Sequence, residues 1–339
     1  HQHPSEPPRE ELWLSADRHT LERVHVLVRH LQPTCAPVTM SQPSGLAPLH
    51  EELQQKLQEV RQSRGFDVAD WVDKKTNMFN EYMSKCGLKA CVVSVSGGVD
   101  SAVTLALMKA ASKKEGSPIE RVVGIAQPIH STAKIQDRAY ECGTALGVDI
   151  ITVDQSSLHT ELCKRAEEAL GVEGQSFARG QLRSYMRTPV NFFVAQLLSQ
   201  QGTPCIVMGT GNYDEDGYLL YFCKAGDGVA DVQLIADIHK SEVFAVGRYL
   251  GVPESILVAP PSADLWEGQT DEEELGFSYD FVELYTEYLK FSEADKESFR
   301  SSLSEAALQE FDTLGGKADA VHNRNKHKLQ CPLNLNILE

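Results

Sequence analysis

The sequence feature that most constrains the fold is SGGVDS at residues 96–101, which follows the apolar run 91–95 and precedes a helix-like stretch. We expect a strand to turn sharply there and to lead directly into the N-terminus of a helix. Backbone N–H groups made accessible by two glycines, two serine hydroxyls and the positive end of the helix dipole would together surround a phosphate group. The segment therefore predicts a nucleotide site. The alternative is a turn that only caps its helix.

Asp100 is the unexpected member of this loop, because a carboxylate repels a phosphate unless a divalent cation lies between them. We therefore interpret Asp100 as a ligand of a Mg²⁺ ion that also binds the phosphates. A second strand-like run, 205–208, leads into GTGNYDE at residues 209–215, where Glu215 would complete the coordination. The alternative for this second loop is a turn held by local hydrogen bonds of Asn212 and Asp214.

The composition indicates a folded, soluble protein. The chain has 339 residues, of which 42% are hydrophobic, so it is long enough to bury a full core. Its formal net charge of −16 argues against a nucleic-acid partner, because such partners require clustered lysine and arginine. No apolar run approaches the roughly 20 residues that span a bilayer, so we expect no membrane segment. The eight cysteines include no CxxC pair, which favours buried reduced thiols and a cytoplasmic location.

The first 39 residues differ in composition from the rest of the chain. They contain five histidines and scattered prolines, and they precede Met40, which we expect to be a natural start. We predict that residues 1–45 form a flexible extension and that residues 46–339 form one folded domain.

Strand-like and helix-like patterns alternate along the folded part. We expect strands at 91–95, 121–127, 149–153 and 205–208, and helices at 49–60, 68–83, 100–113, 134–146, 157–170, 180–200, 239–250, 271–291 and 293–314. Such alternation predicts an α/β fold in which a parallel sheet is covered on both faces and ligands bind at the carboxyl ends of the strands. Residues 217–238 are glycine-rich and read as irregular structure.

The first loop matches neither common nucleotide motif, since it lacks the spacing and lysine of a Walker P-loop and the GxGxxG spacing of dinucleotide folds. SGGxDS instead resembles the pyrophosphate loop of the N-type ATP pyrophosphatases. From about residue 50 to about residue 330 the sequence is similar, more narrowly, to the ammonia-dependent NAD synthetases. The motifs that support this resemblance are SGGVDS, FARG, GTGNYDED, KAGDGVAD, HKSEV, APPSADL and a late His-Lys pair.

This resemblance implies a Rossmann-like doubly wound parallel sheet of the adenine nucleotide alpha hydrolase type, with extra N- and C-terminal helices. The residues implied to bind ATP are Ser94, Val95, Ser96, Gly97, Gly98, Val99, Asp100, Ser101, Thr210, Lys240 and Ser262. The residues implied to hold Mg²⁺ are Asp100 and Glu215. The residues implied to bind the second substrate, nicotinic acid adenine dinucleotide, are Arg187, Lys224, Asp231, His327 and Lys328. Asp100, Lys240 and Asp231 would be catalytic.

Several of these positions also have plainer interpretations. Lys240 suits a solvated helix residue, Asp231 suits a turn, and the pair at 327–328 suits a basic tail. Two positions depart from the family pattern. The sequence around Arg187 reads YMRTPV where many relatives have more arginines, and Ser262 stands where threonine is frequent, which keeps the hydroxyl.

The implied reaction is the last step of NAD biosynthesis, in which ammonia amidates the nicotinate carboxylate through an adenylated intermediate and AMP and pyrophosphate are released. Only about 90 residues precede the first loop, too few for a glutaminase domain, so we expect free ammonia unless a separate subunit supplies it. Relatives are homodimers, which implies a homodimer here. The alternatives are a GMP-synthetase-like subunit, a tRNA-modifying adenylating enzyme and a nucleotide-binding module without turnover.

Overall fold

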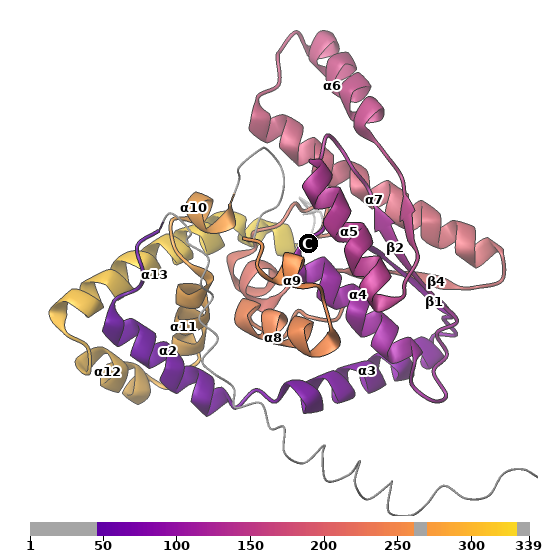
Figure 1. Cartoon of the computed structure of the whole chain (residues 1–339). Helices are drawn as coiled ribbons and strands as arrows, with labels where there is room; N and C mark the ends of the chain where they lie inside the picture. The colour runs from indigo at the N-terminus through magenta and orange to yellow at the C-terminus, as the bar shows by residue number, and fades with distance from the viewer. Residues whose placement is uncertain (1–45, 261–269, 331–339) are drawn as a thin grey trace, which may run out of the picture. The chain divides into compact units, whose positions relative to one another are not determined.

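A parallel five-stranded sheet lies among the helices labelled α4, α5 and α7 in Figure 1, in a computed structural model that describes residues 46–260 and 270–330. All of these residues belong to one compact unit, residues 40–339. The strands are β1 Ala90–Ser94, β2 Arg121–Ala126, β3 Ile150–Thr152, β4 Cys205–Gly209 and β5 Val232–Gln233. Their order in the sheet is β3-β2-β1-β4-β5, and every pair is parallel.

Helices occupy most of the remaining described chain. In chain order they are α2 Glu51–Arg64, α3 Val68–Lys85, α4 Val99–Ser112, α5 Ala133–Leu146, α6 Ser156–Leu170, α7 Ser176–Gln200, the π-helix η1 Tyr213–Leu219, α8 Lys240–Leu250, α9 Glu254–Leu257, α10 Asp271–Leu275, α11 Tyr279–Leu289, α12 Glu293–Ser301, α13 Glu305–Asn325 and the 3₁₀-helix η2 Lys326–Leu329. The predicted doubly wound α/β sheet with extra helices at both ends is confirmed.

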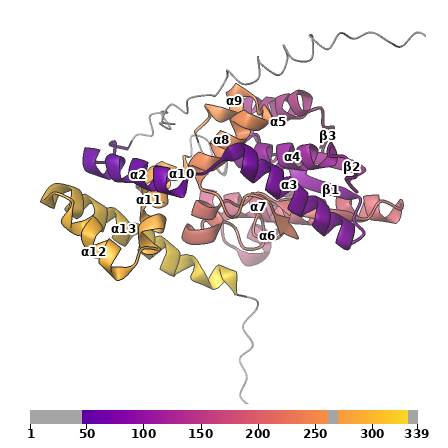
Figure 2. The same ribbon diagram turned by 90° about the horizontal axis from the view of Figure 1, so that it is seen from below.

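Side chains on β1 alternate between two buried cores. Cys91 and Val93 pack in a cluster with α4, α5 and α8, whereas Ala90 and Val92 face the residues of α7. Figure 2 shows α4 and α8 on one side of the strands and α6 and α7 on the other. A strand buried on both faces is uniformly apolar, which explains why the run at 91–95 reads as continuous rather than alternating.

The strand order places the functional loops together. The chain moves from β1 to β2 on one side and later returns to β4 on the other side of β1, so the carboxyl ends of β1 and β4 lie next to each other. This is the topological switch point at which open α/β sheets bind their ligands. The loops after β1 and β4 are the two loops that the sequence predicted to form the site.

A separate helical core joins the two ends of the described chain. Apolar residues of α2 pack with those of α11, α12 and α13, and Leu53, Phe281 and Phe311 are almost completely buried there. Figure 2 shows these helices gathered beside the sheet layers. The N-terminal helix therefore belongs to the same packed unit as the C-terminal ones.

The two long helices predicted at 271–291 and 293–314 are wrong in their bounds, because the region contains four helices. Gly276 adopts a left-handed conformation with φ of +76°, which ends α10, and Ser304 caps a new helix, α13. The predicted end at residue 314 is also wrong. Helix α13 continues through Gly315, where a Cβ atom would lie 2.7 Å from the ring of Tyr285, so the glycine allows close helix packing.

The cysteines of the described part are free thiols, among which Cys91, Cys142 and Cys223 are buried. Among the described helices, none combines the length and apolar character needed to cross a bilayer.

Candidate functional site

The loop between β1 and α4 has the geometry of an anion site. Gly97 has a φ of +81°, a conformation that favours glycine and that turns the chain into α4. The Ser96 and Ser101 hydroxyls lie 3.2 Å apart, and Ser101 donates a hydrogen bond to the carbonyl of Gly98. In the described part of the chain no side chain caps α4 at Gly98, so the positive end of this 14-residue helix faces the loop, and the acid in its first turn is Asp100.

A lysine connects the two predicted metal ligands. Lys240, the first residue of α8, places its Nζ 2.6 Å from Oδ2 of Asp100 and 2.7 Å from Oε1 of Glu215. Its side chain is only 2% exposed, while the two carboxylates are 18% and 17% exposed. The ammonium also lies 5.1 Å from the ring centre of Tyr279, which adds a cation–π contact. The three charged groups therefore form one compact cluster.

Asn212 fixes the two carboxylates relative to each other. Its side-chain Nδ2 donates to Oδ1 of Asp100 at 2.9 Å, and its Oδ1 accepts from the backbone N–H groups of Asp214 and Glu215. The turn with local hydrogen bonds, which the sequence offered as an alternative, is therefore present. It also orients Glu215 into the site, so the two interpretations of this loop are compatible.

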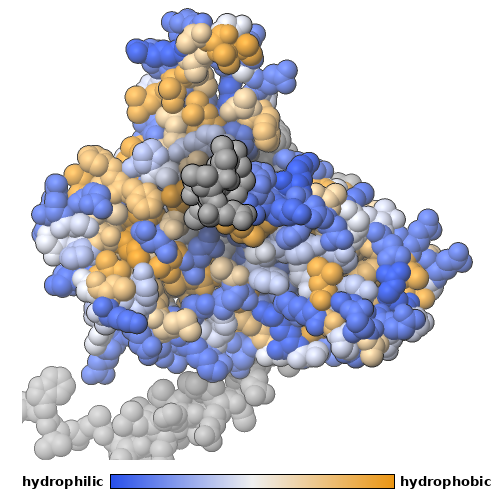
Figure 3. Space-filling view, turned by 180° about the vertical axis from the view of Figure 1, so that it is seen from behind, coloured by the Kyte–Doolittle hydropathy of each residue, from blue (hydrophilic) through white to orange (hydrophobic). Residues whose placement is uncertain are grey.

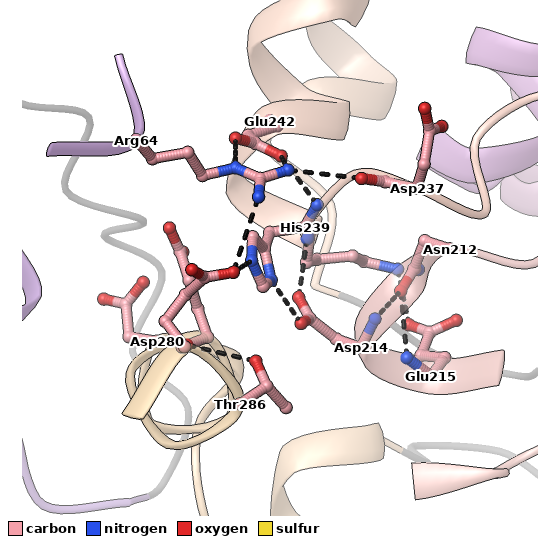
Figure 4. A network of polar contacts seen from close by, with 12 residues as sticks. Arg64, Asn212, Asp214, Glu215, Asp237, His239, Glu242, Asp280 and Thr286 are labelled. Atoms are coloured by element: carbon pink, nitrogen blue, oxygen red, sulfur yellow. Dashed lines mark hydrogen bonds and ion pairs between the residues drawn. The ribbon is translucent and has the colours of Figure 1, made fainter. Parts of the chain in front are cut away.

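Behind this cluster lies a buried ionic network that sequence reasoning missed. Asp214 accepts from the backbone N–H of Lys240 and pairs with Nδ1 of His239, both at 2.7 Å. His239 contacts Glu287 through Nε2 at 2.9 Å, and Glu287 and Glu242 both pair with Arg64. Figure 4 shows His239 enclosed by this network, with Asp214 beneath it and the Arg64–Glu242 pair above. The available signal was the position of Asp214 and His239 directly beside Glu215 and Lys240 in the chain.

Burial and charge together set the protonation of these groups. Burial alone would lower the pKa of Lys240, but Asp100 and Glu215 outweigh it and raise the pKa, so the side chain stays charged. Burial raises the pKa of Asp100, whereas the Lys240 charge overcomes burial and lowers the pKa of Glu215. Burial also opposes the charge on His239, but hydrogen bonds with Asp214 and Glu287 raise its pKa to about 10. His239 is therefore an imidazolium at neutral pH.

A cavity of about 790 Å³ opens at the carboxyl ends of β1 and β4. Its volume is typical of a small-molecule site. Most predicted site residues line it, namely Ser94, Val95, Ser96, Gly97, Gly98, Val99, Asp100, Ser101, Arg187, Thr210, Glu215, Lys224, Lys240, His327 and Lys328. The structure thus brings together residues separated by more than 200 positions in the chain.

Two predicted residues are placed differently. Asp231 is not among the described residues that line the cavity, and its carboxylate accepts a hydrogen bond from the backbone N–H of Val207 at 2.9 Å. In this arrangement it contacts the middle of β4. Ser262 lies outside the described residues, as does most of the APPSADL motif.

The C-terminal basic residues reach the cavity because η2 packs on the chain that follows η1. Lys328 donates to the carbonyls of Leu220 and Phe222, and Lys224 donates to the carbonyl of Gln330. Burial lowers the pKa of Lys328. Both residues line the cavity. Lys328 is partly buried and held by two carbonyls, which does not fit a solvated tail, whereas His327 is exposed, as that interpretation expects.

The donor set fits a hard divalent cation. Asp100 and Glu215 offer carboxylate oxygens on the cavity side, and the ammonium of Lys240 already lies within hydrogen-bond distance of both. Mg²⁺ commonly uses one or two carboxylates together with substrate phosphates. The described residues contain no group of three or more acidic, histidine or cysteine side chains suited to a metal by themselves. The fit therefore requires phosphate oxygens to complete the coordination.

Known proteins resemble this chain over most of its length. The profile of the NAD synthase family matches residues 71–332. An NH₃-dependent NAD⁺ synthetase of Methanococcoides burtonii is 37% identical over 199 residues, 58% of this chain and 70% of that protein. The corresponding protein of Thermococcus sibiricus is 30% identical over 271 residues, 80% of this chain and 98% of that protein.

A solved structure shares both the fold and appreciable sequence. The NMN synthetase of Francisella tularensis superimposes with a TM-score of 0.64 at 27% identity, and the match covers 80% of this chain and all of that one.

Removal of the Lys240 charge should destabilise the protein, because it leaves two carboxylates close together without their cation. We expect Lys240→Met to lower the free energy of unfolding by about 3–5 kcal/mol in urea titrations. Millimolar MgCl₂ should restore part of this loss by replacing the missing charge. Lys75→Met, which removes a lysine paired with the exposed Asp237, is the matched control and should cost about 1 kcal/mol or less without a magnesium effect. Equal stability of Lys240→Met and wild type would contradict the charge balance described here.

The pKa shifts of His239 and Glu287 predict a pH dependence of stability. The pKa of His239 is raised from 6.5, so its contribution is complete below about pH 6.5 and is lost as the pH rises through about 10. The pKa of Glu287 is lowered to about 2, chiefly by its hydrogen bond with His239, so its contribution is complete above about pH 4.5 and is lost toward pH 2.

We therefore expect the unfolding free energies of wild type and His239→Gln to differ most between about pH 4.5 and about pH 6.5. The difference should shrink steadily as the pH approaches 10. Urea unfolding at several pH values measures it, and a difference that stays constant from about pH 5.5 to about pH 9.5 would show that the imidazolium charge contributes nothing.

Proposed function

Since the chain belongs to the NAD synthase family, we propose that it amidates nicotinic acid adenine dinucleotide with ammonia and consumes ATP. The observation that most supports this function is the meeting of the uncapped N-terminus of α4 with Asp100, Glu215 and Lys240 at one end of the cavity. That arrangement suits a polyphosphate accompanied by a divalent cation.

The reaction proceeds in two steps. The nicotinate carboxylate attacks the α-phosphorus of ATP, which forms a mixed anhydride and expels pyrophosphate. Ammonia then attacks the carbonyl carbon of the anhydride, and AMP leaves with its electron pair while the nitrogen loses a proton to give the amide of NAD⁺. AMP is a far better leaving group than hydroxide, so the first step makes the second feasible. Positioning and electrostatic stabilisation supply the catalysis.

The loop and the helix would bind ATP. The N–H groups at the start of α4 and the hydroxyls of Ser96 and Ser101 face the phosphates, and Thr210 contributes from the end of β4. When bound, Mg²⁺ offsets the negative charge on the leaving pyrophosphate, and Asp100 and Glu215 are the residues that would hold it. Lys240 supplies a second, permanently charged group beside the same phosphates.

The second substrate would bind in the same cavity. Arg187, Lys224, His327 and Lys328 line it and offer positive or polar groups to a dinucleotide that carries phosphates. We retain Asp231 in the proposed set, although its observed hydrogen bond to β4 favours a supporting role. Ser262, outside the described residues, stays a proposed ATP contact.

The size of the acceptor is a specific question, because the structurally similar Francisella protein is an NMN synthetase. Nicotinic acid mononucleotide carries the same nicotinate carboxylate as the dinucleotide and is the second candidate acceptor. The sequence identity to NH₃-dependent NAD⁺ synthetases favours the dinucleotide. The same family membership disfavours the GMP-synthetase-like, tRNA-modifying and non-catalytic alternatives.

A second copy of the chain is the proposed partner. Several apolar side chains are exposed along α7, namely Phe177, Tyr185, Phe193 and Leu197, and Leu158 and Leu162 are exposed on α6. We call these six residues the α6–α7 apolar surface. Figure 3 shows apolar side chains gathered over this part of the surface. Phe177 and Tyr185 also line the cavity, so this apolar surface adjoins the substrate site. These features support a homodimer whose interface lies beside the dinucleotide.

The free thiols of the described cysteines support a reducing compartment, which we propose to be the cytoplasm. We further propose that residues 46–339 form one synthetase domain, in line with the compact unit that contains them.

The proposed function predicts AMP, not ADP, as the nucleotide product. Purified protein with ATP, MgCl₂ and ammonium should convert nicotinic acid adenine dinucleotide to NAD⁺ faster than it converts the mononucleotide or XMP. Asp100→Asn should lower kcat at least about 100-fold, because it weakens the charge cluster at the phosphates. Asp312→Asn, on an exposed ion pair, is the matched control and should retain activity.

Formation of ADP, or absence of turnover with every acceptor by folded wild-type protein, would refute the proposed function. A higher kcat/KM for the mononucleotide would instead change the substrate and leave the chemistry intact. Circular dichroism and Tm of Asp100→Asn confirm that a loss of activity does not reflect unfolding.

The proposed dimer surface predicts a change of mass on mutation. Phe193→Asp places a charge in the α6–α7 apolar surface, where Phe193 is 63% exposed, and should convert a dimer to a monomer in sedimentation experiments. Tyr249→Asp, on α8 and 56% exposed, is the control and should leave the mass unchanged. A monomeric wild type, or a dimeric Phe193→Asp protein, would exclude this surface as the interface.

A further inference from the structure

We propose that Asp214 and His239 are positioning residues that hold Glu215 and Lys240 in the geometry required for phosphate chemistry. This inference rests on the proposed function and assigns a role to two residues that would touch neither substrate. Both side chains are completely buried, and both adjoin in the chain a residue that lines the cavity.

The geometry consists of two adjacent pairs. Glu215 and Lys240 form the pair that faces the cavity, at 2.7 Å. One residue earlier in each segment, Asp214 and His239 form the pair that faces the protein interior, also at 2.7 Å. Two segments 25 positions apart, the start of η1 and the start of α8, are thereby joined at consecutive residues. A single pair would leave the segments free to rotate about it, whereas two adjacent pairs restrict that rotation.

The Asp214 carboxylate also acts on Lys240 directly. Its Oδ2 accepts a hydrogen bond from the backbone N–H of Lys240 at 2.7 Å, while Oδ1 pairs with His239. The backbone N–H at the start of a helix has no partner within the helix, so a buried carboxylate there is strongly favoured. One side chain therefore fixes both the position of the Lys240 backbone and the first turn of α8.

His239 connects the start of α8 to the helical core. Its Nε2 pairs with Glu287 of α11, and Glu287 pairs in turn with Arg64 at the end of α2. The backbone N–H of His239 donates to Glu242 at 2.9 Å, and Glu242 also pairs with Arg64. Arg64 thus contacts Glu242 and Glu287, two of the three acids that hold His239. The position of Lys240 consequently depends on helices that lie outside the sheet layers.

Loss of these two positioning residues should affect kcat more than the affinity for ATP. A displacement of about 1 Å in a group that stabilises a transition state can cost about 100-fold in rate, while ground-state binding spread over a large cavity changes little. We expect Asp214→Asn and His239→Gln each to lower kcat for NAD⁺ formation by about 10- to 100-fold and to change KM for ATP by less than about threefold.

The matched control is Phe311→Leu. Phe311 is a buried residue of α13 in the same helical core, so this variant loosens the packing there without removing a charge. It should lower Tm as much as the two test variants while kcat stays within about twofold of wild type. A purely structural role of Asp214 and His239 would instead give the same behaviour in all three variants.

A double-mutant cycle on kcat distinguishes positioning from a general loss of stability. If the two residues act as one unit, Asp214→Asn/His239→Gln should lose no more kcat than the worse single variant. Independent additive losses in kcat, or a kcat within twofold of wild type for both singles, would overturn the proposal. If Asp214→Asn does not fold, the proposal is tested by comparing the kcat and KM of His239→Gln with those of Phe311→Leu. Lack of turnover by wild type would count against the proposed function only.

Discussion

The active geometry depends on one buried ammonium group. Lys240 is nearly inaccessible to solvent and lies within 2.7 Å of two carboxylates that come from different loops. Without that charge, Asp100 and Glu215 would repel each other, and the ends of β1 and β4 would lose the interaction that draws their loops together. The cluster also has a net negative charge, so it favours an additional cation when a polyphosphate arrives. The same residues therefore stabilise the empty site and prepare it for a charged ligand.

The fold supplies these residues through its strand order. Because β1 and β4 are neighbours although more than 100 residues separate them, Asp100 and Glu215 emerge at one edge of the sheet. The lysine comes from a third segment, the first turn of α8, which packs against α4 in the same core. The C-terminal helix adds η2 at the far side of the cavity. A site assembled from four distant segments requires the whole described unit to be folded.

Much of this arrangement followed from the sequence, and the parts that did not have identifiable causes. Four of the five strands, most helices and both loops were predicted because apolar periodicity and glycine positions are local signals, whereas the short β5 lies in the segment 217–238 that was predicted to be irregular. The breaks at Gly276 and Ser304 and the continuation through Gly315 were missed, since the last depends on contact with Tyr285, a residue of another helix. Asp214 and His239 were overlooked because a buried acid and a histidine gain meaning only when the fold pairs them. Asp231 was assigned to the substrate site by resemblance. Its hydrogen bond with Val207 is a tertiary contact, which sequence spacing does not reveal.

The acidity of the chain does not conflict with a site for anionic substrates. A net charge of −16 spread over the surface is screened within about 8 Å at physiological ionic strength, so it acts weakly on a ligand inside the cavity. Inside the cavity, local charges act on the ligand. They are the helix dipole of α4, the ammonium of Lys240, and the basic residues Lys224, His327 and Lys328. Asp100 and Glu215, the two acids beside Lys240, are already paired with its ammonium group, so their repulsion of a phosphate is reduced. Overall charge therefore excludes an extended polyanion such as nucleic acid far more effectively than it excludes a nucleotide that enters a cavity of about 790 Å³.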